Sequence, residues 1–305
     1  MEGLRGSSGE ANVHAAWRMA LAQRAAQAYA RNEHLAALAV AGSVGTGLAD
    51  RFSDLELDCY WSSPPADRDR TGPIGTLGGE LVALWAYDHD DQEWSEDYRL
   101  GKLDVTVSNF LTSTIERFVD DVVLRADTAL VKHVRLAALQ RCRPLAGAQM
   151  IESWRARAAR FPDTLVTALV EQSLAPGVLS GWAARDALAS RGDDLAIHDL
   201  LARAERAVLG VVLALNRIYL PHPLIKWQRQ LISGLDVAPE RLAERLQLLW
   251  TREPAKALQE AEALLAETVL LAEAHTDASI SPFREALSQR RRAIDPPIVD
   301  RANVA

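Results

Sequence analysis

The sequence has few cysteines, few aromatic residues and no excess of basic residues, and each shortage excludes a class of protein. Its two cysteines, Cys59 and Cys142, show neither a pair motif nor metal-ligand spacing. We therefore expect neither a disulfide framework nor a structural zinc site. The small number of cysteines favours a reducing compartment, and we expect the cytoplasm. Aromatic residues make up only 6% of the chain. Alanine and leucine dominate instead, which favours helix over strand.

Basic residues are too few for a surface that binds nucleic acid. Lysine and arginine together number 34 against 41 acidic residues, and the formal net charge is -7. Such a chain lacks the broad positive surface that neutralises a run of phosphates. We therefore expect neither DNA nor RNA as a partner.

Long hydrophobic runs are also missing. No window approaches about 18 uncharged apolar residues, so no membrane span and no membrane partner are predicted. Residues 1–12 are mostly polar and small, without the pattern of a signal peptide, and we expect a flexible N-terminus. The chain does have size, because 305 residues with 49% hydrophobic content can bury a large core.

The first third of the chain carries the patterns of a small sheet. Residues 13–34 have the spacing of an amphipathic helix, and 35–41 form a short apolar run that ends at a Gly/Ser turn. Residues 54–61 and 102–108 alternate polar with apolar side chains, as a strand with one polar face does. Residues 80–87 are a further candidate strand. The patterns predict an α/β fold, a small mixed sheet with flanking helices.

The rest of the chain carries helical patterns. From residue 111 to about residue 275, proline and glycine interrupt one helical segment after another. We therefore predict an α/β domain at 13–125, an all-α helical bundle at 126–280 and a tail at 281–305. The active cleft is expected between the two domains, where ligands are usually enclosed.

Three carboxylates occupy positions from which they can converge. Asp54 and Glu56 stand at i and i+2 of one predicted strand and so point the same way, while Asp104 lies on another strand. Carboxylates packed together repel one another unless a hard divalent cation lies between them, and Mg²⁺ suits an open oxygen cluster. Two such ions could activate an attacking oxygen and neutralise a leaving pyrophosphate. The cluster predicts phosphoryl or nucleotidyl transfer.

The stretch 41–61 (AGSVGTGLADRFSDLELDCYW) resembles the glycine-serine and paired acidic motifs of the DNA polymerase β-like nucleotidyltransferase superfamily. The stretch 102–107 (KLDVTV) resembles its third-acid strand. Because a helical domain follows, the overall likeness is to the aminoglycoside and lincosamide nucleotidyltransferases. The motif match covers only residues 36–108, and Glu56 stands where aspartate is more usual.

The resemblance implies a role for each motif residue. Gly42 and Ser43 would hold the nucleotide phosphates, and Asp54 and Glu56 would bind both metal ions. Asp104 would join the metal site or help to deprotonate the acceptor. These three acids are the predicted catalytic residues and metal ligands.

Three further features are weighed beside these motifs. Lys226, in the segment 216–227 (NRIYLPHPLIKW), could close on the triphosphate as a point charge and is a candidate nucleotide-binding residue. Asp58 extends the acidic strand face and is expected to be solvated or ion-paired. The acidic stretch 88–97 is expected to be an exposed loop, with contact to a cationic acceptor as the alternative.

The predicted function is Mg²⁺-dependent transfer of a nucleoside monophosphate from an NTP, with ATP expected, to a hydroxyl of a small-molecule acceptor. Pyrophosphate is the leaving group of this reaction. A cationic acceptor is one of the expected kinds. Two alternatives stay open, namely nucleotidylation of a protein side chain, as in antitoxin-type enzymes, and a catalytically inactive nucleotide-sensing module. A homodimer is possible. A template-directed polymerase is disfavoured by the acidic balance.

Overall fold

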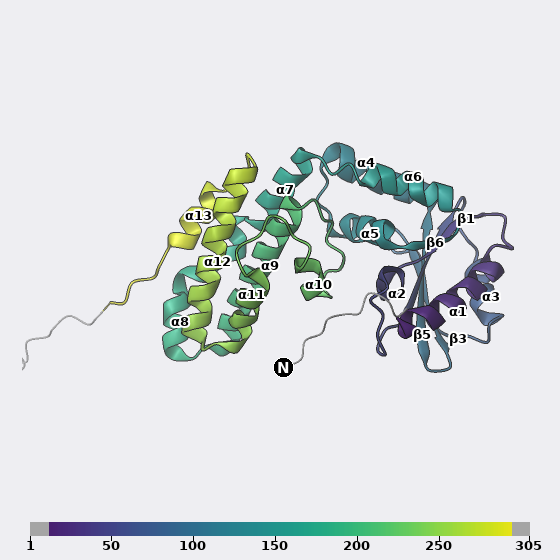
Figure 1. Ribbon diagram of the computed structural model, residues 1–305, viewed down its shortest axis with the longest axis horizontal. Coiled ribbons are helices and arrows are strands. Elements are labelled where there is room, and N and C mark those ends of the chain that lie inside the picture. The colour runs from purple at the N-terminus through teal and green to yellow at the C-terminus, as the bar shows by residue number, and fades with distance from the viewer. Residues whose placement is uncertain (1–11, 295–305) are drawn as a thin grey trace, which may run out of the picture. The chain divides into compact units, whose positions relative to one another are not determined.

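The computed structural model describes residues 12–294, which form two compact units (Figure 1). The first unit holds the chain up to Leu165 together with the segment Tyr219–Lys226. The second holds Val166–Ile218 and the residues from Trp227 on. The predicted flexible N-terminus lies outside the described residues except for Asn12, whose side chain caps the first helix.

A six-stranded mixed sheet frames the first unit, in the order β3-β4-β5-β2-β1-β6. The pair β2 and β5 is parallel, and the other neighbouring pairs are antiparallel. The predicted α/β class with a mixed sheet is thereby confirmed. The strands are β1 (Leu35–Val40), β2 (Leu55–Trp61), β3 (Glu80–Leu84), β4 (Trp94–Leu100), β5 (Leu103–Leu111) and β6 (Arg143–Ala146).

Helices cover both faces of this sheet. On one face, α1 and α3 supply side chains to a continuous apolar cluster with β1, β2 and β5. On the other face, Trp154 of α6 packs against Tyr60 of β2 with ring centroids 5.2 Å apart. The helices of this unit are α1 (Val13–Tyr29), α2 (Gly42–Thr46), α3 (Asp67–Gly75), α4 (Thr112–Arg125), α5 (Leu130–Arg141) and α6 (Ala148–Ala158).

Alternation along β2 and β5 decides which face is apolar. Their odd-numbered side chains point into the cluster with α1, where burial of each Val or Leu contributes about 1.5–3 kcal/mol. Their even-numbered side chains must point to the opposite face. The polar side chains that the sequence singled out therefore share the face away from this core. The buried residues that the two strands supply to this cluster are Leu55, Leu57, Cys59, Trp61, Leu103, Val105 and Val107.

Two strands lie where the sequence patterns did not predict them. β4 begins inside the stretch 88–97 that we expected to be a loop, and β6 lies in the region expected to hold helices only. β6 is too short to show a period, and it pairs with β1 alone at the sheet edge. Its Pro144 fits such an edge because proline cannot donate a ladder hydrogen bond.

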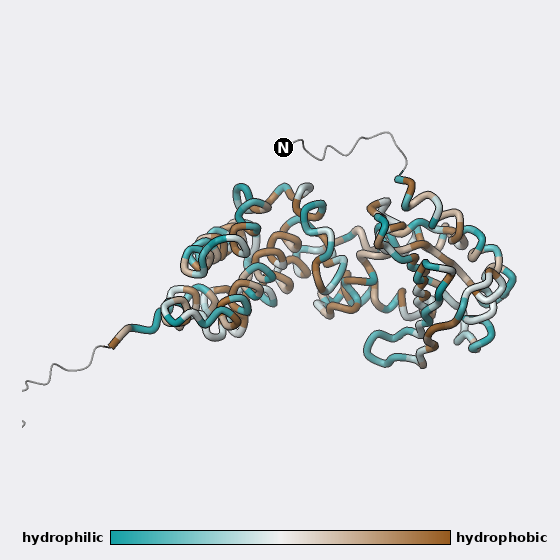
Figure 2. The backbone as a smooth tube through the Cα atoms, turned by 90° about the horizontal axis from the view of Figure 1, so that it is seen from below, coloured by the Kyte–Doolittle hydropathy of each residue, from teal (hydrophilic) through white to brown (hydrophobic). Residues whose placement is uncertain are grey.

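The described elements of the second unit are helical. Helix α9 buries one apolar stripe over residues 197–204 and is buried on almost every side over residues 207–214. Figure 2 shows hydrophobic and hydrophilic stretches alternating along the helices. Helix α7 (Asp163–Ser173) crosses the unit boundary. The others are α8 (Arg185–Arg191), α9 (Asp194–Leu215), α10 (Gln228–Ile232), α11 (Leu242–Thr251), α12 (Pro254–His275) and α13 (Ser281–Ser288), with 3-10 turns at Pro176–Leu179 and Trp182–Ala184.

The predicted domain boundaries shift accordingly. The first unit extends past residue 125 to Leu165, because α4, α5, β6 and α6 contact one another or the sheet. The predicted tail at 281–305 begins with α13, whose Phe283 and Leu287 are buried; its last part lies outside the described residues. Within residues 12–294, no helix is long and apolar enough to cross a membrane.

Candidate active site

The register of β2 and β5 brings the predicted acids onto one face of the sheet. The two strands are parallel and pair Glu56 with Thr106. Continuing this register one residue back places Asp54 beside Asp104, and side chains paired across neighbouring strands share a face. Asp54 and Asp104 thus form one row on the polar face, and Glu56 lies in the next row.

The turn before α2 approaches Glu56 closely. Gly42 has a φ of +56°, in the left-handed region that favours glycine, and a Cβ atom built there would lie 2.5 Å from Glu56 Cδ and Oε1. The backbone N–H of Ala41 donates to the carbonyl oxygen of Glu56 at 3.0 Å. Any side chain at position 42 would displace the Glu56 carboxylate, so this glycine is required for the contact between the turn and the acid.

Ser43 presents a buried hydroxyl to this region. Its Oγ has no hydrogen-bond partner, whereas its carbonyl oxygen accepts from Leu48 N at 2.9 Å and from Thr46 Oγ1 at 3.1 Å. Leaving a buried polar group unpaired costs about 1–3 kcal/mol. The turn itself therefore leaves this buried hydroxyl without a partner.

Glu56 carries the strongest electrostatic signal of the predicted acids. Burial, followed by the like charges of Asp54 and Asp58, raises the pKa of Glu56 to about 7. The positive charges of Lys226 and Arg135 act in the opposite direction. Lys226 lies far from Glu56 in the sequence but in a segment that belongs to the same compact unit. A cation bound here would relieve the repulsion between Glu56 and its neighbours.

Asp104 is the most exposed of the three predicted acids and is paired with a basic side chain. Its side chain is 72% exposed, and its Oδ1 lies 3.5 Å from Nε of Arg99. Within residues 12–294, no group of three or more His, Cys, Asp or Glu side chains is close enough to hold a metal ion. The turn and the pair Asp54 and Glu56 are brought together, and Asp104 lies at the edge of this arrangement.

An ion-pair network that the sequence patterns did not reveal lies on the same face. Asp58 is 3% exposed, and its Oδ1 is 3.9 Å from Nη1 of Arg135 on α5. Nη2 of Arg135 donates to Glu93 Oε2 at 2.7 Å. The guanidinium also lies over the Phe110 ring, 4.6 Å from its centroid. Asp58 is thus ion-paired, one of the two predicted states, and Glu93, predicted to lie in an exposed loop, is buried.

A further carboxylate faces the same side of the sheet. Asp97 of β4 pairs with Thr106, and Thr106 Oγ1 donates to Asp97 Oδ1 at 2.8 Å. Trp85 Nε1 donates to Asp97 Oδ2 at 3.3 Å. Asp97 therefore lies in the row of Glu56, two strands away. Its place in β4, a strand that the sequence patterns did not predict, kept it out of the predicted site.

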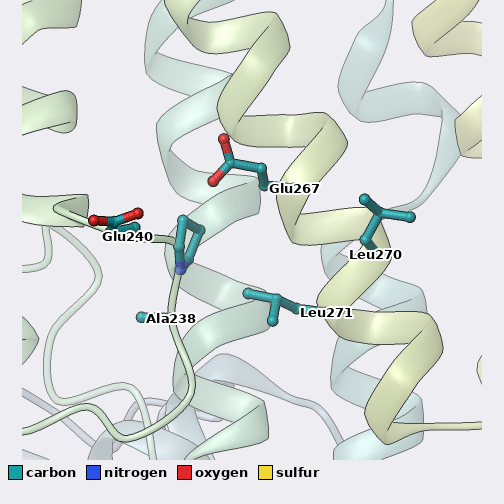
Figure 3. Close-up of a pocket in the computed structure, with 6 residues that line it drawn as sticks. Ala238, Glu240, Glu267, Leu270 and Leu271 are labelled. Atoms are coloured by element: carbon teal, nitrogen blue, oxygen red, sulfur yellow. The ribbon is translucent and has the colours of Figure 1, made fainter.

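A hollow of about 300 Å³ in the second unit has a different character (Figure 3). Its lining is largely apolar, and its Glu267 is ion-paired with Arg245 at 2.6 Å. It offers neither a phosphate-binding turn nor an acid pair. The hollow is lined by Ala238, Pro239, Glu240, Glu267, Leu270 and Leu271.

Comparison with known proteins finds a family match over part of the chain and a similar solved structure. No curated protein matches the sequence. Among solved structures, a nucleotidyltransferase-like protein from Exiguobacterium sibiricum is similar, with 14% sequence identity and a TM-score of 0.39, over 84% of this chain and 78% of that one. Residues 130–228, from the first turn of α5 to just beyond Lys226, match the family described as Domain of unknown function (DUF4037).

Proposed function

We propose that this chain is an Mg²⁺-dependent nucleotidyltransferase that transfers a nucleoside monophosphate from an NTP, ATP first, to a hydroxyl of a small-molecule acceptor. The observation that carries the proposal is the contact between the Gly42 turn and Glu56. A tight glycine turn with an unpaired serine hydroxyl lies directly against an acid pair. Phosphate binding and metal binding would thus meet in one place.

The donor set fits Mg²⁺. Asp54 and Glu56 offer carboxylate oxygens from one strand face, and the raised pKa of Glu56 indicates negative charge that the protein leaves uncompensated. Asp104 would supply the third carboxylate after its exposed side chain leaves Arg99. When bound, Mg²⁺ would neutralise phosphate charge and favour ionisation of the acceptor hydroxyl.

The protein groups divide the remaining work. The turn at Gly42 and the Ser43 hydroxyl would hold the phosphates, and the ammonium of Lys226 would add a point charge toward the triphosphate. Asp104 would accept the proton of the acceptor hydroxyl while the oxygen of that hydroxyl attacks the α-phosphorus. The new P–O bond then replaces the bond to pyrophosphate, which leaves.

The open part of the polar face would receive the acceptor. Asp97 and Asp104 both carry carboxylates there, and each interacts with a neighbouring side chain, Thr106 or Arg99. Carboxylates in this position would attract a positively charged acceptor. This supports the cationic class of small molecule over a neutral one.

A nucleotide-binding module without catalysis is the second candidate. The ion pair between Asp104 and Arg99 favours it, because the third carboxylate is engaged away from Asp54 and Glu56. Transfer of labelled nucleotide separates the two functions. An enzyme requires Asp104 for transfer, whereas a binding module transfers nothing.

Calorimetric titration of Mg²⁺ with each of ATP, GTP, CTP and UTP tests the shared part of both functions. We expect binding by the wild type and its loss in an Asp54→Ala, Glu56→Ala double variant. Glu116→Ala, which removes an exposed acid on α4, is the control and should bind normally. A folded wild type that binds no Mg·NTP would overturn the proposal.

A further inference from the structure

We propose that Tyr219 is a positioning residue, which anchors the segment Tyr219–Lys226 on the sheet-containing unit so that Lys226 is presented to the Asp54 and Glu56 pair. We call this segment the strap. The inference rests on the proposed function. It adds a residue that supports nucleotide binding without touching the nucleotide.

The strap is separated in sequence from the unit to which it belongs. By its contacts the strap belongs to the unit that holds the sheet. The residues before it, up to Ile218, and those after it, from Trp227, belong to the other unit. A short segment with this connectivity needs an anchor of its own. Tyr219, its first residue, is only 2% exposed, whereas Leu224 is 70% exposed and Lys226 is also exposed.

Tyr219 is fixed by three contacts within the first unit. Its hydroxyl donates to the carbonyl oxygen of Ala158, the last residue of α6, at 2.7 Å. Its ring centroid lies 5.5 Å from that of His133 on α5 and 4.8 Å from that of Phe161. Burial raises the pKa of Tyr219, so the hydroxyl stays protonated and remains a donor. The anchor therefore holds in the whole neutral pH range.

Beyond the anchor, the strap is folded by its own hydrogen bonds. Leu224 N donates to His222 Nδ1 at 3.0 Å, and Ile225 N donates to His222 O at 2.9 Å. Ile225 has a φ of +49°, which a β-branched residue rarely adopts without support from its surroundings. Pro221 and Pro223 restrict φ on either side of His222. This turn leads directly into Lys226, so the position of the lysine depends on where the strap is anchored.

The charge of Lys226 shows where the strap leads. By its contacts the strap, which ends at Lys226, belongs to the unit that holds Asp54 and Glu56, and the positive charge of Lys226 acts on the Glu56 carboxylate. An exposed lysine next to a metal-binding acid pair is suited to contact the phosphates that such a site binds. Loosening the strap at Tyr219 would leave this lysine in the chain but no longer hold it beside the acids.

A double-mutant cycle tests this directly, with Mg²⁺ and the non-hydrolysable analogue α,β-methylene-ATP as the probe in calorimetry on the full chain. Tyr219→Phe removes only the hydroxyl and with it the hydrogen bond to Ala158, and Lys226→Ala removes the ammonium group together with the chain that carries it. We expect Lys226→Ala to weaken binding at least about tenfold and Tyr219→Phe to weaken it several-fold. The combined variant should bind no more weakly than Lys226→Ala alone.

Tyr98→Phe is the matched control. Tyr98 is also 2% exposed, and its hydroxyl likewise donates to a carbonyl oxygen, that of Arg70, at 3.2 Å. It should lower the melting temperature about as much as Tyr219→Phe and leave probe binding unchanged. Thermal unfolding of each variant verifies that it is folded.

Two results would overturn the inference. One is unchanged probe affinity in Tyr219→Phe while Lys226→Ala binds weakly. The other is a Tyr219→Phe loss of the same size with and without Lys226, because a general structural role would weaken both backgrounds equally. Failure of the wild type to bind the probe would instead remove the proposed function, and the inference with it.

Discussion

The carboxylate of Glu56 fills the space in which a side chain on Gly42 would lie, since a Cβ atom there would be 2.5 Å from the carboxylate. The glycine and the acid are therefore one structural unit. A substitution at either residue should therefore alter the conformation of the other.

Gly42→Ala should destabilise the protein by about 1–3 kcal/mol and abolish Mg·ATP binding, because it adds both backbone strain and a clash with Glu56. Gly78→Ala is the control. Gly78 has a φ of +80°, but a Cβ atom there would meet nothing within 4 Å. It should cost stability through strain alone and leave binding intact. Thermal unfolding and calorimetry measure the two effects; equal binding by both variants would contradict the prediction.

Arg135→Met should destabilise the fold by up to about 3–5 kcal/mol, because it leaves the buried carboxylates of Asp58 and Glu93 without their shared cation. Adding Glu93→Gln to this variant should restore part of the stability, since one uncompensated charge is then removed. Chemical denaturation of the single and double variants measures both changes. A double variant less stable than Arg135→Met would show that the ion pair is not the cause.

Stability should fall as pH rises from about 4.5 to about 7. In the folded state, burial raises the pKa of Glu56 and that of Glu93 from the ordinary value of 4.5 to about 7. In this window the folded protein keeps protons that the unfolded chain has released, so raising the pH favours unfolding. Above about pH 7 this contribution levels off.

Glu56→Gln should make that decline shallower, because it removes one of the two groups. Glu80→Gln, a change at an exposed acid of β3, should leave the slope unaltered. Denaturation midpoints at several pH values provide the comparison. Identical slopes for the wild type and Glu56→Gln would contradict the assignment.

Asp104→Asn should reduce nucleotide transfer by about 10²–10⁴-fold while Mg·ATP binding persists, as expected for loss of a proton acceptor. Transfer is followed by mass spectrometry of a small-molecule extract incubated with enzyme and labelled ATP. Glu116→Gln, a change at an exposed acid on α4, serves as the control. Full transfer by Asp104→Asn would exclude this residue as the base.

Sequence periodicity predicted the strands that have one apolar and one polar face. It failed for a strand that carries charged side chains on both faces. β2 and β5 alternate clearly because one face meets the core. β4 does not, because its core-facing Glu96 is fully buried and held by Arg70, which donates to Glu96 Oε2 at 2.9 Å. A charged residue at an inward position makes a strand look like a solvated loop. Asp97, on the other face of β4, was missed for this reason.

Long-range pairing explains what else the sequence could not predict. The order of acids along the chain indicated a convergent face, and the register of β2 and β5 agrees with it. Arg135 gave no signal, because its partners Asp58 and Glu93 lie on other elements and the helix that carries it looks ordinary. Asp104 pairs with Arg99 of β4, a strand that no sequence pattern predicted.

The position of the strap in the chain limits how this protein can be divided. A fragment that stops at Leu165 would retain Gly42, Asp54, Glu56 and Asp104 and yet lack Lys226. Such a fragment would carry every proposed metal ligand but would lack the lysine ammonium that is proposed to contact the triphosphate. No single cut of the polypeptide separates the sheet-containing unit from the rest, so both units must be synthesised together for the site to be complete.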